Sequence, residues 1–368
     1  MPFSAGTFRR RANDTSRLPA NRPGSSMSAA PQVSLLIPTH NNARTIAETI
    51  ESCARQTFRD LEIVVYDEES RDATRNLINA AAASDPRIRV LTSETNSGPL
   101  RAWRKLLYEA RGRHCTWVWS DDLIMPRYVE VLHGALEKNP SHLLAGCNAY
   151  RYYYPTDPHI PVPKANLDQP HPEWELLNEL YPTTTLKGDA YALGIFAKVY
   201  PVTQMCNLFR TSAVKEVFDD YIQLENPFGF DYSRLAYGND VAFLSELGLR
   251  SGELVQVGDP LVVARSTPNS LTERLIKKDR WQYWLQYTWA FYHGWSRCRN
   301  LSPRMDTLVR LALDRVHFCN LPYGLKNRLW PKYGNPFRAA RALWFILRHD
   351  RHFKKDAGPA SMEAYLSG

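Results

Sequence analysis

The chain has 368 residues, of which 44% are hydrophobic and 12% aromatic, and its formal net charge is +8 at pH 7. This length and composition suffice for a buried core and exclude a wholly disordered chain, so we expect one large folded domain or two fused halves. No apolar run reaches the roughly 18 residues of a membrane span, and the start lacks the apolar stretch of about 7 to 15 residues that a signal peptide carries. We therefore expect a soluble protein whose folded body faces the cytosol.

Charge is spread unevenly along the chain. Residues 1 to 30 hold five Arg against one Asp, and residues 271 to 368 hold eighteen Lys or Arg against seven acids, which leaves a net charge of −7 for residues 31 to 270. The acidic middle argues against nucleic acid as a partner. Residues 1–30 are rich in Arg, Ser, Pro and Ala without hydrophobic periodicity, so we predict a disordered N-terminal tail, with Met27 as a candidate for the natural start. The six cysteines form no CxxC pair, so neither a zinc site nor a disulfide framework is indicated.

Short β-branched or apolar runs alternate with helix-like segments in the first 120 residues. The expected strands are 33–37, 61–66, 88–92 and 115–119, and the expected helices are 43–56, 71–83 and 98–111. This alternation is typical of a mainly parallel sheet covered on both faces. After about residue 150 the pattern is irregular, until regular elements return. These are a strand at 205–209, helices from 212 and over 239–247, and paired strands near 253–257 and 260–264.

Polar residues follow three of the predicted strands. Thr39 and Asn41 come after the first strand, Asp67 ends the second, and Asp121 and Asp122 follow the fourth. Because parallel strands end at one edge of a sheet, where open α/β folds bind their ligands, we expect these side chains to lie along the same edge. Two adjacent carboxylates there suit Mg²⁺ or Mn²⁺, which prefer hard oxygen ligands. The alternative is an acidic turn that caps the following helix.

Four segments, in this order and spacing, resemble a family 2 glycosyltransferase of the GT-A fold. Residues 33–72 resemble the N-terminal segment of the family, and the family's usual DDGSTD motif is DEESRD in this chain. Residues 96–112 (NSGPLRAWRKLLYEARG) keep the residue spacing of the family's next motif. The family's DxDD corresponds to 119–122 (WSDD), and 237–272 resemble its acceptor-side block. The resemblance implies a Rossmann-like, mainly parallel central sheet flanked by helices. Residues 31–150 would form the nucleotide-sugar-binding half of this domain and 151–270 its acceptor-binding half.

The resemblance also implies which residues bind the nucleotide-sugar donor. These are Pro38, Thr39, Asn41, Asp67, Arg101, Ser120, Asp121 and Arg265. Asp67 would accept hydrogen bonds from the base or ribose, because an ionised carboxylate only accepts, unless it serves as a helix cap. Arg265 would make a bidentate phosphate contact, unless it forms a surface salt bridge.

Asp121 matches the metal-binding Asp of the family's motif, and with Asp122 it would hold Mg²⁺ or Mn²⁺ against the diphosphate. The sequence also departs from the family's motifs at two positions. Trp119 replaces the first Asp of DxDD, and Glu69 replaces the Gly of DDGSTD. Because Glu69 lacks the easy access of glycine to positive φ, we expect the nucleotide-side turn to differ.

Asp240, in the segment GND, aligns with the family's general base. A carboxylate beside the acceptor hydroxyl takes up its proton as the oxygen attacks the anomeric carbon. The alternative is a charge favoured by the dipole at a helix N-terminus. Asn239 stands where many relatives have Glu.

Residues 271–368 read as a basic, aromatic-rich helical extension. Trp and Leu recur near helical spacing between 275 and 295, interleaved with Lys and Arg. Such helices lie on anionic membranes, or their apolar stripe packs on the catalytic domain.

We interpret the chain as a cytoplasmic, metal-dependent, inverting glycosyltransferase of polysaccharide or glycoconjugate biosynthesis. Its partners would be a nucleotide-sugar donor, a glycan or lipid-linked acceptor, and an anionic membrane on the inner face of the plasma membrane. The alternative is a non-catalytic relative that binds sugar nucleotides or glycans.

Overall fold

The computed structural model describes residues 30–153, 166–178, 180, 182–197, 200–222, 238–266 and 290. The predicted N-terminal tail and the predicted helical extension over 271–368 lie outside the described residues, apart from residues 30 and 290. No helix in the described part of the chain is long and apolar enough to cross a membrane.

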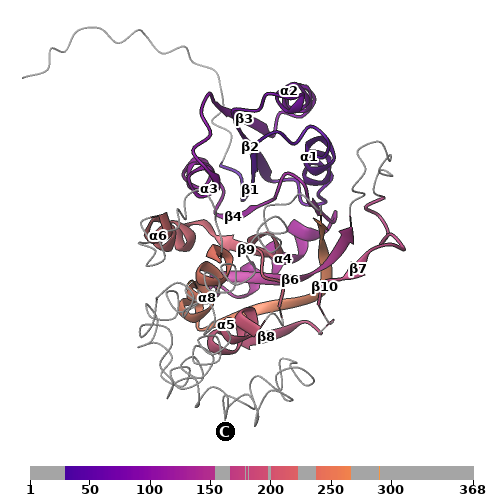
Figure 1. Ribbon diagram of the computed structural model, residues 1–368. Coiled ribbons are helices and arrows are strands. Elements are labelled where there is room, and N and C mark those ends of the chain that lie inside the picture. Colours follow the sequence, from indigo (N-terminus) through magenta and orange to yellow (C-terminus); the bar gives the residue numbers. More distant parts are fainter. Residues whose placement is uncertain are drawn as a thin grey trace, which may run out of the picture. The chain divides into compact units, whose positions relative to one another are not determined.

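A mixed sheet organises the described residues (Figure 1). Its strand order is β3-β2-β1-β4-β9-β6-β10-β5, with β7 beside β6 and β8 beside β10. The first four strands are parallel: β3 (Ile88–Ser93), β2 (Leu61–Glu68), β1 (Val33–Thr39) and β4 (His114–Trp117). Both β1 and β2 are buried almost throughout, as strands covered on both faces should be. The predicted α/β class and the four N-terminal strands are confirmed.

The second half of the sheet mixes strand directions. β9 (Asn207–Arg210) runs antiparallel to β4 and to β6 (Leu144–Tyr153). β10 (Glu253–Ser266) is parallel to β6 and antiparallel to β5 (Leu123–Ile124) and β8 (Thr184–Lys187). The short β7 (Glu175–Leu176) pairs with β6.

The prediction of two paired strands near 253–257 and 260–264 is wrong. These residues form the single strand β10, which changes register on β6 around Pro260. Gly258, Asp259 and Pro260 have the composition of a turn. A bulge accommodates them instead, because proline has no N–H to donate to the ladder.

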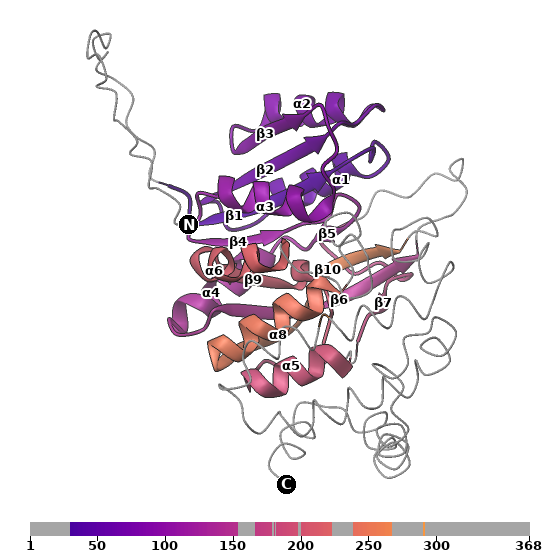
Figure 2. The same cartoon turned by 60° about the vertical axis from the view of Figure 1, so that its left-hand side comes forward.

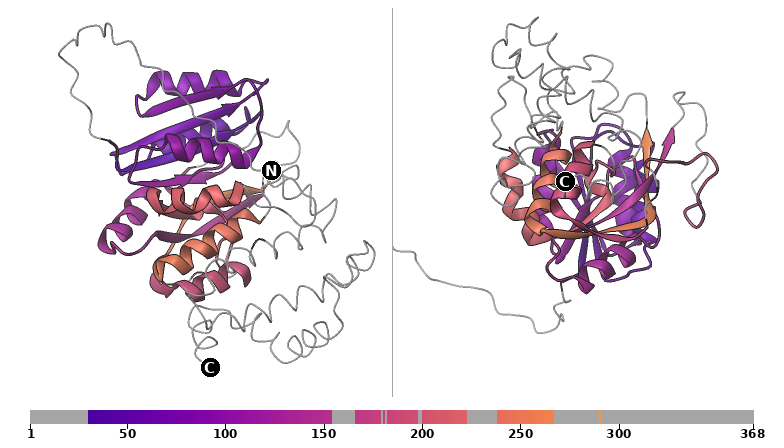
Figure 3. Two further views of the ribbon diagram at one scale, coloured as in Figure 1. Left: turned by 90° about the vertical axis from the view of Figure 1, so that its left-hand side faces the viewer. Right: turned by 90° about the horizontal axis from the view of Figure 1, so that it is seen from below.

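Helices cover both faces of this sheet. On one face α1 (Ile46–Ala54), α2 (Thr74–Ser84) and α4 (Tyr128–Lys138) share a buried core that includes Ile50, Ile78 and Leu132. On the other face lie α3 (Pro99–Glu109), α5 (Gly188–Ala197), α6 (Thr211–Ile222) and α8 (Asn239–Ser251). Figures 2 and 3 show α6, α8 and α5 following one another along that face.

Trp117 is the centre of the second core. Its ring is fully buried and lies 5.4 Å from the ring of Phe218 and 5.9 Å from that of Phe243. Since Trp117 is the last residue of β4, this packing anchors the strand that leads into the WSDD segment. A short 3-10 helix, η1 (Gln204–Cys206), precedes β9 and lies at the same end of β4.

Candidate active site

The carboxyl ends of β1 and β2 lie side by side. Thr39 and Asp67 are partners in the parallel ladder, and Asp67 is partnered in turn by Thr92 of β3. Both are buried, with exposed fractions of 5% for Thr39 and 0% for Asp67. Thr39 Oγ1 and Asp67 Oδ1 have no hydrogen-bond partner among the described residues. The expectation that the polar tips of these strands share one sheet edge is confirmed.

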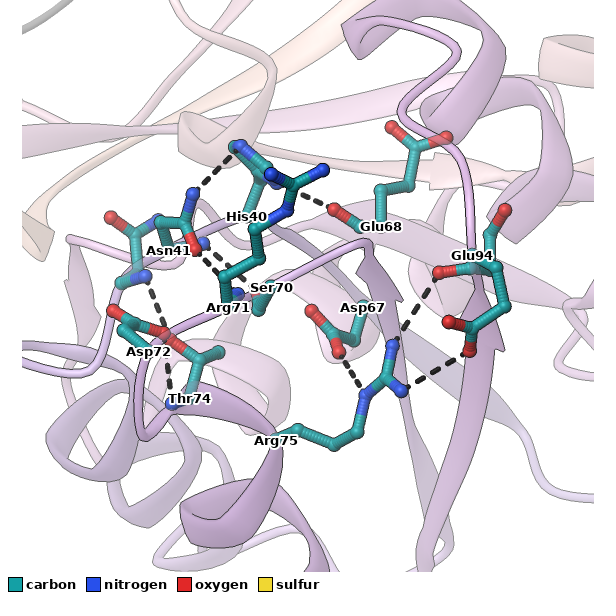
Figure 4. A network of polar contacts seen from close by, with 12 residues as sticks. His40, Asn41, Asp67, Glu68, Ser70, Arg71, Asp72, Thr74, Arg75 and Glu94 are labelled. Atoms are coloured by element: carbon teal, nitrogen blue, oxygen red, sulfur yellow. Dashed lines mark hydrogen bonds and ion pairs between the residues drawn. The ribbon is translucent and has the colours of Figure 1, made fainter.

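Arg75, on the first turn of α2, contacts the other oxygen of Asp67. Its Nε donates to Asp67 Oδ2 over 2.8 Å, and its Nη1 donates to Glu94 Oε1 over 3.2 Å. Figure 4 shows the guanidinium between the two carboxylates. The hydrogen bond with Asp67 is the main reason that the pKa of Arg75 is raised. Arg75 therefore engages one oxygen of the buried Asp67 side chain.

Hydrogen bonds join the loop that follows β1 to the loop that follows β2 (Figure 4). The backbone N–H of Asn41 donates to Ser70 Oγ, and Asn41 Oδ1 accepts from the backbone N–H of Arg71. Glu69 adopts φ +57° and Asn41 φ +52°. Glu69 thus adopts positive φ although it is not a glycine, and the expected difference of this turn from that of the family stays a prediction. Glu69 accepts the left-handed conformation that a glycine would take there, and its side chain bonds with Arg71 and with the backbone N–H of Asn96.

Side chains of α1 and of the loop before it hold the WSDD segment. Thr45 Oγ1 and Thr49 Oγ1 donate to the carbonyl of Ser120 over 2.9 and 3.1 Å, and Thr49 Oγ1 also contacts the carbonyl of Asp122. Asn42 Nδ2 donates to Ser120 Oγ. These hydrogen bonds therefore fix the backbone of the WSDD segment against α1 and the loop that follows β1.

Trp119 is the residue that the resemblance matches to the first Asp of the family motif. The indole Nε1 donates to Thr203 Oγ1 over 3.0 Å, and the ring lies 4.7 Å from that of Trp103. Trp119 thus fills its position with packing against α3 and a hydrogen bond to the loop before η1.

Asp121 and Asp122 form an acidic pair, in which Asp122 is buried and Asp121 is half-buried. Burial raises the pKa of Asp121, and burial together with the charge of Asp121 raises the pKa of Asp122 well above its ordinary value. The charge of Arg265 acts in the opposite direction on both. Two hard oxygen donors that repel each other fit a divalent cation such as Mg²⁺ or Mn²⁺, because the ion would relieve that repulsion.

Arg265, near the end of β10, is 5% exposed and bound to this segment. Its backbone N–H donates to Asp122 Oδ1 over 2.7 Å, and its Nε donates to the carbonyl of Asp121. Its Nη1 pairs with Glu48 on α1, and its Nη2 donates to Thr49. The arginine of the Arg265–Glu48 salt bridge is therefore buried. A role in phosphate binding stays a prediction, and the contacts that the structure gives Arg265 are those of a positioning residue.

Asp240 lies in the first turn of α8, after Gly238 at φ +73°. Burial raises its pKa to about 7, opposed by a hydrogen bond with Gln204 of η1. Asp240 Oδ1 has no hydrogen-bond partner among the described residues. Thr203, the neighbour of Gln204 in the chain, accepts the hydrogen bond from the Trp119 indole. The start of η1 therefore connects Asp240 with the WSDD segment. Thr203 and Gln204 had no recognisable motif in the sequence.

The two remaining predicted donor residues occupy the same half. Pro38 lies in β1 and is partly exposed, and Arg101 is exposed in the first turn of α3, after Gly98 at φ +91°. Their donor contacts, like those of the other predicted residues, stay predictions.

A second titratable cluster lies at the amino end of β4. His114, His133 and Glu137 bring three possible metal-ligating atoms within 4.8 Å of one another. Arg210 Nη1 lies 3.2 Å from His114 Nε2, and Arg113 pairs with Glu137. Burial lowers the pKa of His114 to about 4, helped by the charge of His133. Because Arg210 and Arg113 already contact His114 Nε2 and Glu137, the cluster is better suited to a structural role than to a cation.

Comparison with known proteins adds a family match. The family model described as "Glycosyl transferase family 2" matches residues 34–218. Among curated proteins, glycosyltransferase GlyG of Streptococcus pneumoniae is 28% identical over 120 residues, which are 33% of this chain and 40% of GlyG. The Escherichia coli UDP-Glc:alpha-D-GlcNAc-diphosphoundecaprenol beta-1,3-glucosyltransferase WfgD is 32% identical over 114 residues, 31% of this chain and 44% of WfgD. The matched segment thus spans less than half the length of these relatives.

Among solved structures, residues 1–349 of S. aureus TarS in complex with UDP-GlcNAc align with a TM-score of 0.50 and 17% identity, covering 92% of each chain. A likeness at this identity is evidence of a shared fold. It agrees with the predicted arrangement of a central α/β sheet flanked by helices.

Proposed function

Because the chain belongs to glycosyl transferase family 2, we propose that it transfers a sugar from a nucleotide-diphosphate donor to an acceptor hydroxyl, with inversion at the anomeric carbon. One observation carries this proposal. Asp67 lies beside Thr39 at the carboxyl ends of β2 and β1. Thr45 and Thr49 hold the WSDD segment, which carries Asp121 and Asp122, and Thr203 and Gln204 connect this segment with Asp240.

The donor side is built on the first four strands. Asp67 accepts a hydrogen bond from the base or ribose, and Thr39, Asn41, Ser120 and the exposed Arg101 surround the nucleotide. Fixed donors and acceptors of this kind hold a substrate at low entropic cost during reaction.

Asp121 and Asp122 would hold a divalent cation, Mg²⁺ or Mn²⁺. When bound, the ion would neutralise the charge that accumulates on the departing nucleoside diphosphate. Asp121 is the more available ligand, because Asp122 Oδ1 already accepts from the backbone of Arg265. Arg265, Thr45 and Thr49 fix the backbone that carries both carboxylates.

Asp240 accepts the proton of the attacking hydroxyl. The acceptor oxygen forms the new bond to the anomeric carbon while the bond to the diphosphate oxygen breaks on the opposite face, so one displacement inverts the centre. A base with a pKa of about 7 is well matched to this work near neutral pH.

Acceptor and pathway are proposed from the relatives' names. One relative acts on a diphosphoundecaprenol-linked sugar, and a Rhizobium meliloti relative, 38% identical over 96 residues, is a succinoglycan biosynthesis protein. We accordingly propose a glycan or lipid-linked acceptor in polysaccharide or glycoconjugate assembly, at the cytoplasmic face of the membrane.

Release of nucleoside diphosphate tests the proposal against a non-catalytic binding role. The protein is incubated with UDP-glucose, UDP-GlcNAc and GDP-mannose, with Mn²⁺ or Mg²⁺ and then with EDTA. Metal-dependent release, even slow hydrolysis without acceptor, is expected for at least one donor. Binding of donors without any release, with and without acceptor glycans, would identify a binding relative instead.

A further inference from the structure

Two buried glutamines differ in what their side chains contact. The amide of Gln56 donates to the carbonyls of Ser52 and Met125 over 3.1 and 2.9 Å, and its Oε1 accepts from a backbone N–H of α4. Gln204 is 1% exposed, yet its Oε1 has no hydrogen-bond partner among the described residues, and its side chain forms a hydrogen bond with Asp240. The amide of Gln56 therefore has a structural role, whereas that of Gln204 contacts the proposed base.

The unpaired oxygen of Gln204 is unfavourable for stability. Buried polar atoms in folded proteins are almost always hydrogen-bonded, because an unpaired one has lost its hydrogen bonds to water without replacement. A methionine of similar length would fill this position without an unpaired polar atom. The amide therefore indicates a role beyond packing, and its described partner is the Asp240 carboxylate.

The backbone that carries Gln204 is held from two sides. The hydroxyl of Tyr128 on α4 donates to the carbonyl of Met205 over 2.9 Å. On the other side the Trp119 indole donates to Thr203 Oγ1 over 3.0 Å. The amide of Gln204 therefore extends from a fixed backbone, as a preorganised hydrogen-bond donor in an active site does.

Two opposing effects act on the charge of Asp240. Burial raises its pKa to about 7, and the hydrogen bond with Gln204 acts in the opposite direction. An N–H that donates to a carboxylate stabilises the ionised form more than the neutral form. Among the described residues, no charged side chain contributes to this shift. Apart from the dipole at the start of α8, the amide of Gln204 is thus the group that favours the charge.

We propose that Gln204 is a positioning residue for the general base: its amide N–H orients the Asp240 carboxylate and favours the ionised form that takes up the acceptor's proton. The inference rests on the proposed function, in which Asp240 is the base. Gln204 acts through Asp240 and takes no proton itself, because an amide does not titrate in this pH range. Without the amide, the buried carboxylate would stay protonated to higher pH, and a protonated base cannot act.

The test replaces Gln204 by Met and follows kcat/KM from pH 6 to 9.5 with Mg²⁺. The reaction is release of nucleoside diphosphate from whichever of UDP-glucose, UDP-GlcNAc and GDP-mannose the wild-type protein turns over. Loss of a hydrogen bond to a charged group should move the inflection upward from about 7 by about one to two pH units. The ratio of wild-type to variant rate should therefore be about 10-fold larger at pH 6 than at pH 9.5.

Gln256→Met is the matched control. Gln256 is also buried, but it lies in β10, where its ladder partners are Gly146 of β6 and Thr184 of β8. This variant should keep the wild-type inflection. The affinity for UDP, titrated calorimetrically with Mg²⁺, should be unchanged in both variants, because Gln204 is proposed to act on the base and not on the donor.

Equal rate ratios at the two pH values in a folded Gln204→Met protein would overturn the inference, since a merely structural role lowers the rate without moving the inflection. Should that variant fail to fold, Gln204→Asn decides in the same way, because its shorter side chain withdraws the amide from Asp240. Asp240→Asn separates this failure from that of the proposed function. A near-normal rate in Asp240→Asn would remove the base itself, whereas a large loss there with an unmoved inflection in Gln204→Met would remove only the role of Gln204.

Discussion

The backbone N–H of Arg265 donates to Asp122 Oδ1 over 2.7 Å, although the two residues are 143 positions apart in the chain. The side chain of Arg265 extends the connection to the carbonyl of Asp121 and to Glu48 on α1. The end of β10 therefore fixes the acidic pair against the first helix. The predicted donor and acceptor halves are thus joined at the residues proposed to hold the metal.

Arg265→Met should reduce the free energy of unfolding by about 3 to 5 kcal/mol, because it removes one partner of a buried ion pair and leaves Glu48 without its charge partner. Urea unfolding followed by fluorescence measures this loss. Arg104→Met is the control: Arg104 pairs with Asp219 at the surface, where an ion pair contributes about 0 to 1 kcal/mol. Equal losses in the two variants would show that the Arg265 contacts do little for stability.

The sequence predicted the parallel strands well because β1, β2 and β4 are buried on both faces and have uniform apolar runs. It also predicted that Thr39, Asp67 and Asp121 would share an edge, since parallel strands end together. Local patterns could not predict β10 as one strand, because its bulge has the composition of a turn.

Contacts between distant residues were likewise hidden from the sequence. The pairing of Asp67 with Arg75 depends on how α2 packs beside β2, and the link from Asp240 to Gln204 depends on where η1 lies in the sheet. Glu69 is a further residue whose conformation depends on such contacts. A residue type that disfavours positive φ adopts it, because contacts with Arg71 and Asn96 fix the turn.

Asp121→Asn should abolish the metal dependence of donor binding, because a neutral amide is a poor ligand for a divalent ion facing a diphosphate. Calorimetric titration of UDP with Mn²⁺ and with EDTA gives the metal dependence of the affinity. Asp219→Asn, a change to a carboxylate on α6, serves as control and should behave as wild type. An Asp121→Asn protein whose UDP affinity still rises with Mn²⁺ would remove Asp121 from the ligand set.

The rate of transfer should depend on pH through Asp240. The base works only when ionised, and burial raises the pKa of Asp240 to about 7. At subsaturating substrates, kcat/KM should therefore fall about 10-fold per pH unit below that value and reach a plateau above it. The same shift makes ionised Asp240 a cost to folding, so its contribution to stability is present below the unfolded pKa and is lost as pH rises through about 7. A profile without an inflection between pH 6 and 8 would argue against Asp240 as the base.

Residues 271–368, with eighteen basic and seven acidic side chains, should bind the full-length protein to anionic vesicles. Each basic residue near such a surface contributes about 1 kcal/mol, and salt screens the attraction. Co-sedimentation with vesicles containing phosphatidylglycerol should exceed that with phosphatidylcholine alone and should decline with added salt. Replacing Lys277, Lys278 and Arg280 by Gln should reduce it. Binding that is indifferent to lipid charge would favour packing of this segment on the catalytic domain.

The most direct measurement pairs nucleotide titration with single-turnover transfer on Asp240→Asn. Since Asp240 is proposed to act on the acceptor proton and not on the donor, the variant should keep the wild-type affinity for UDP. Its transfer rate should fall by at least about 100-fold, the lower range for loss of general-base catalysis. Near-normal turnover in a variant with normal affinity would contradict the account, and Asp240 would then be only a charge at the start of α8.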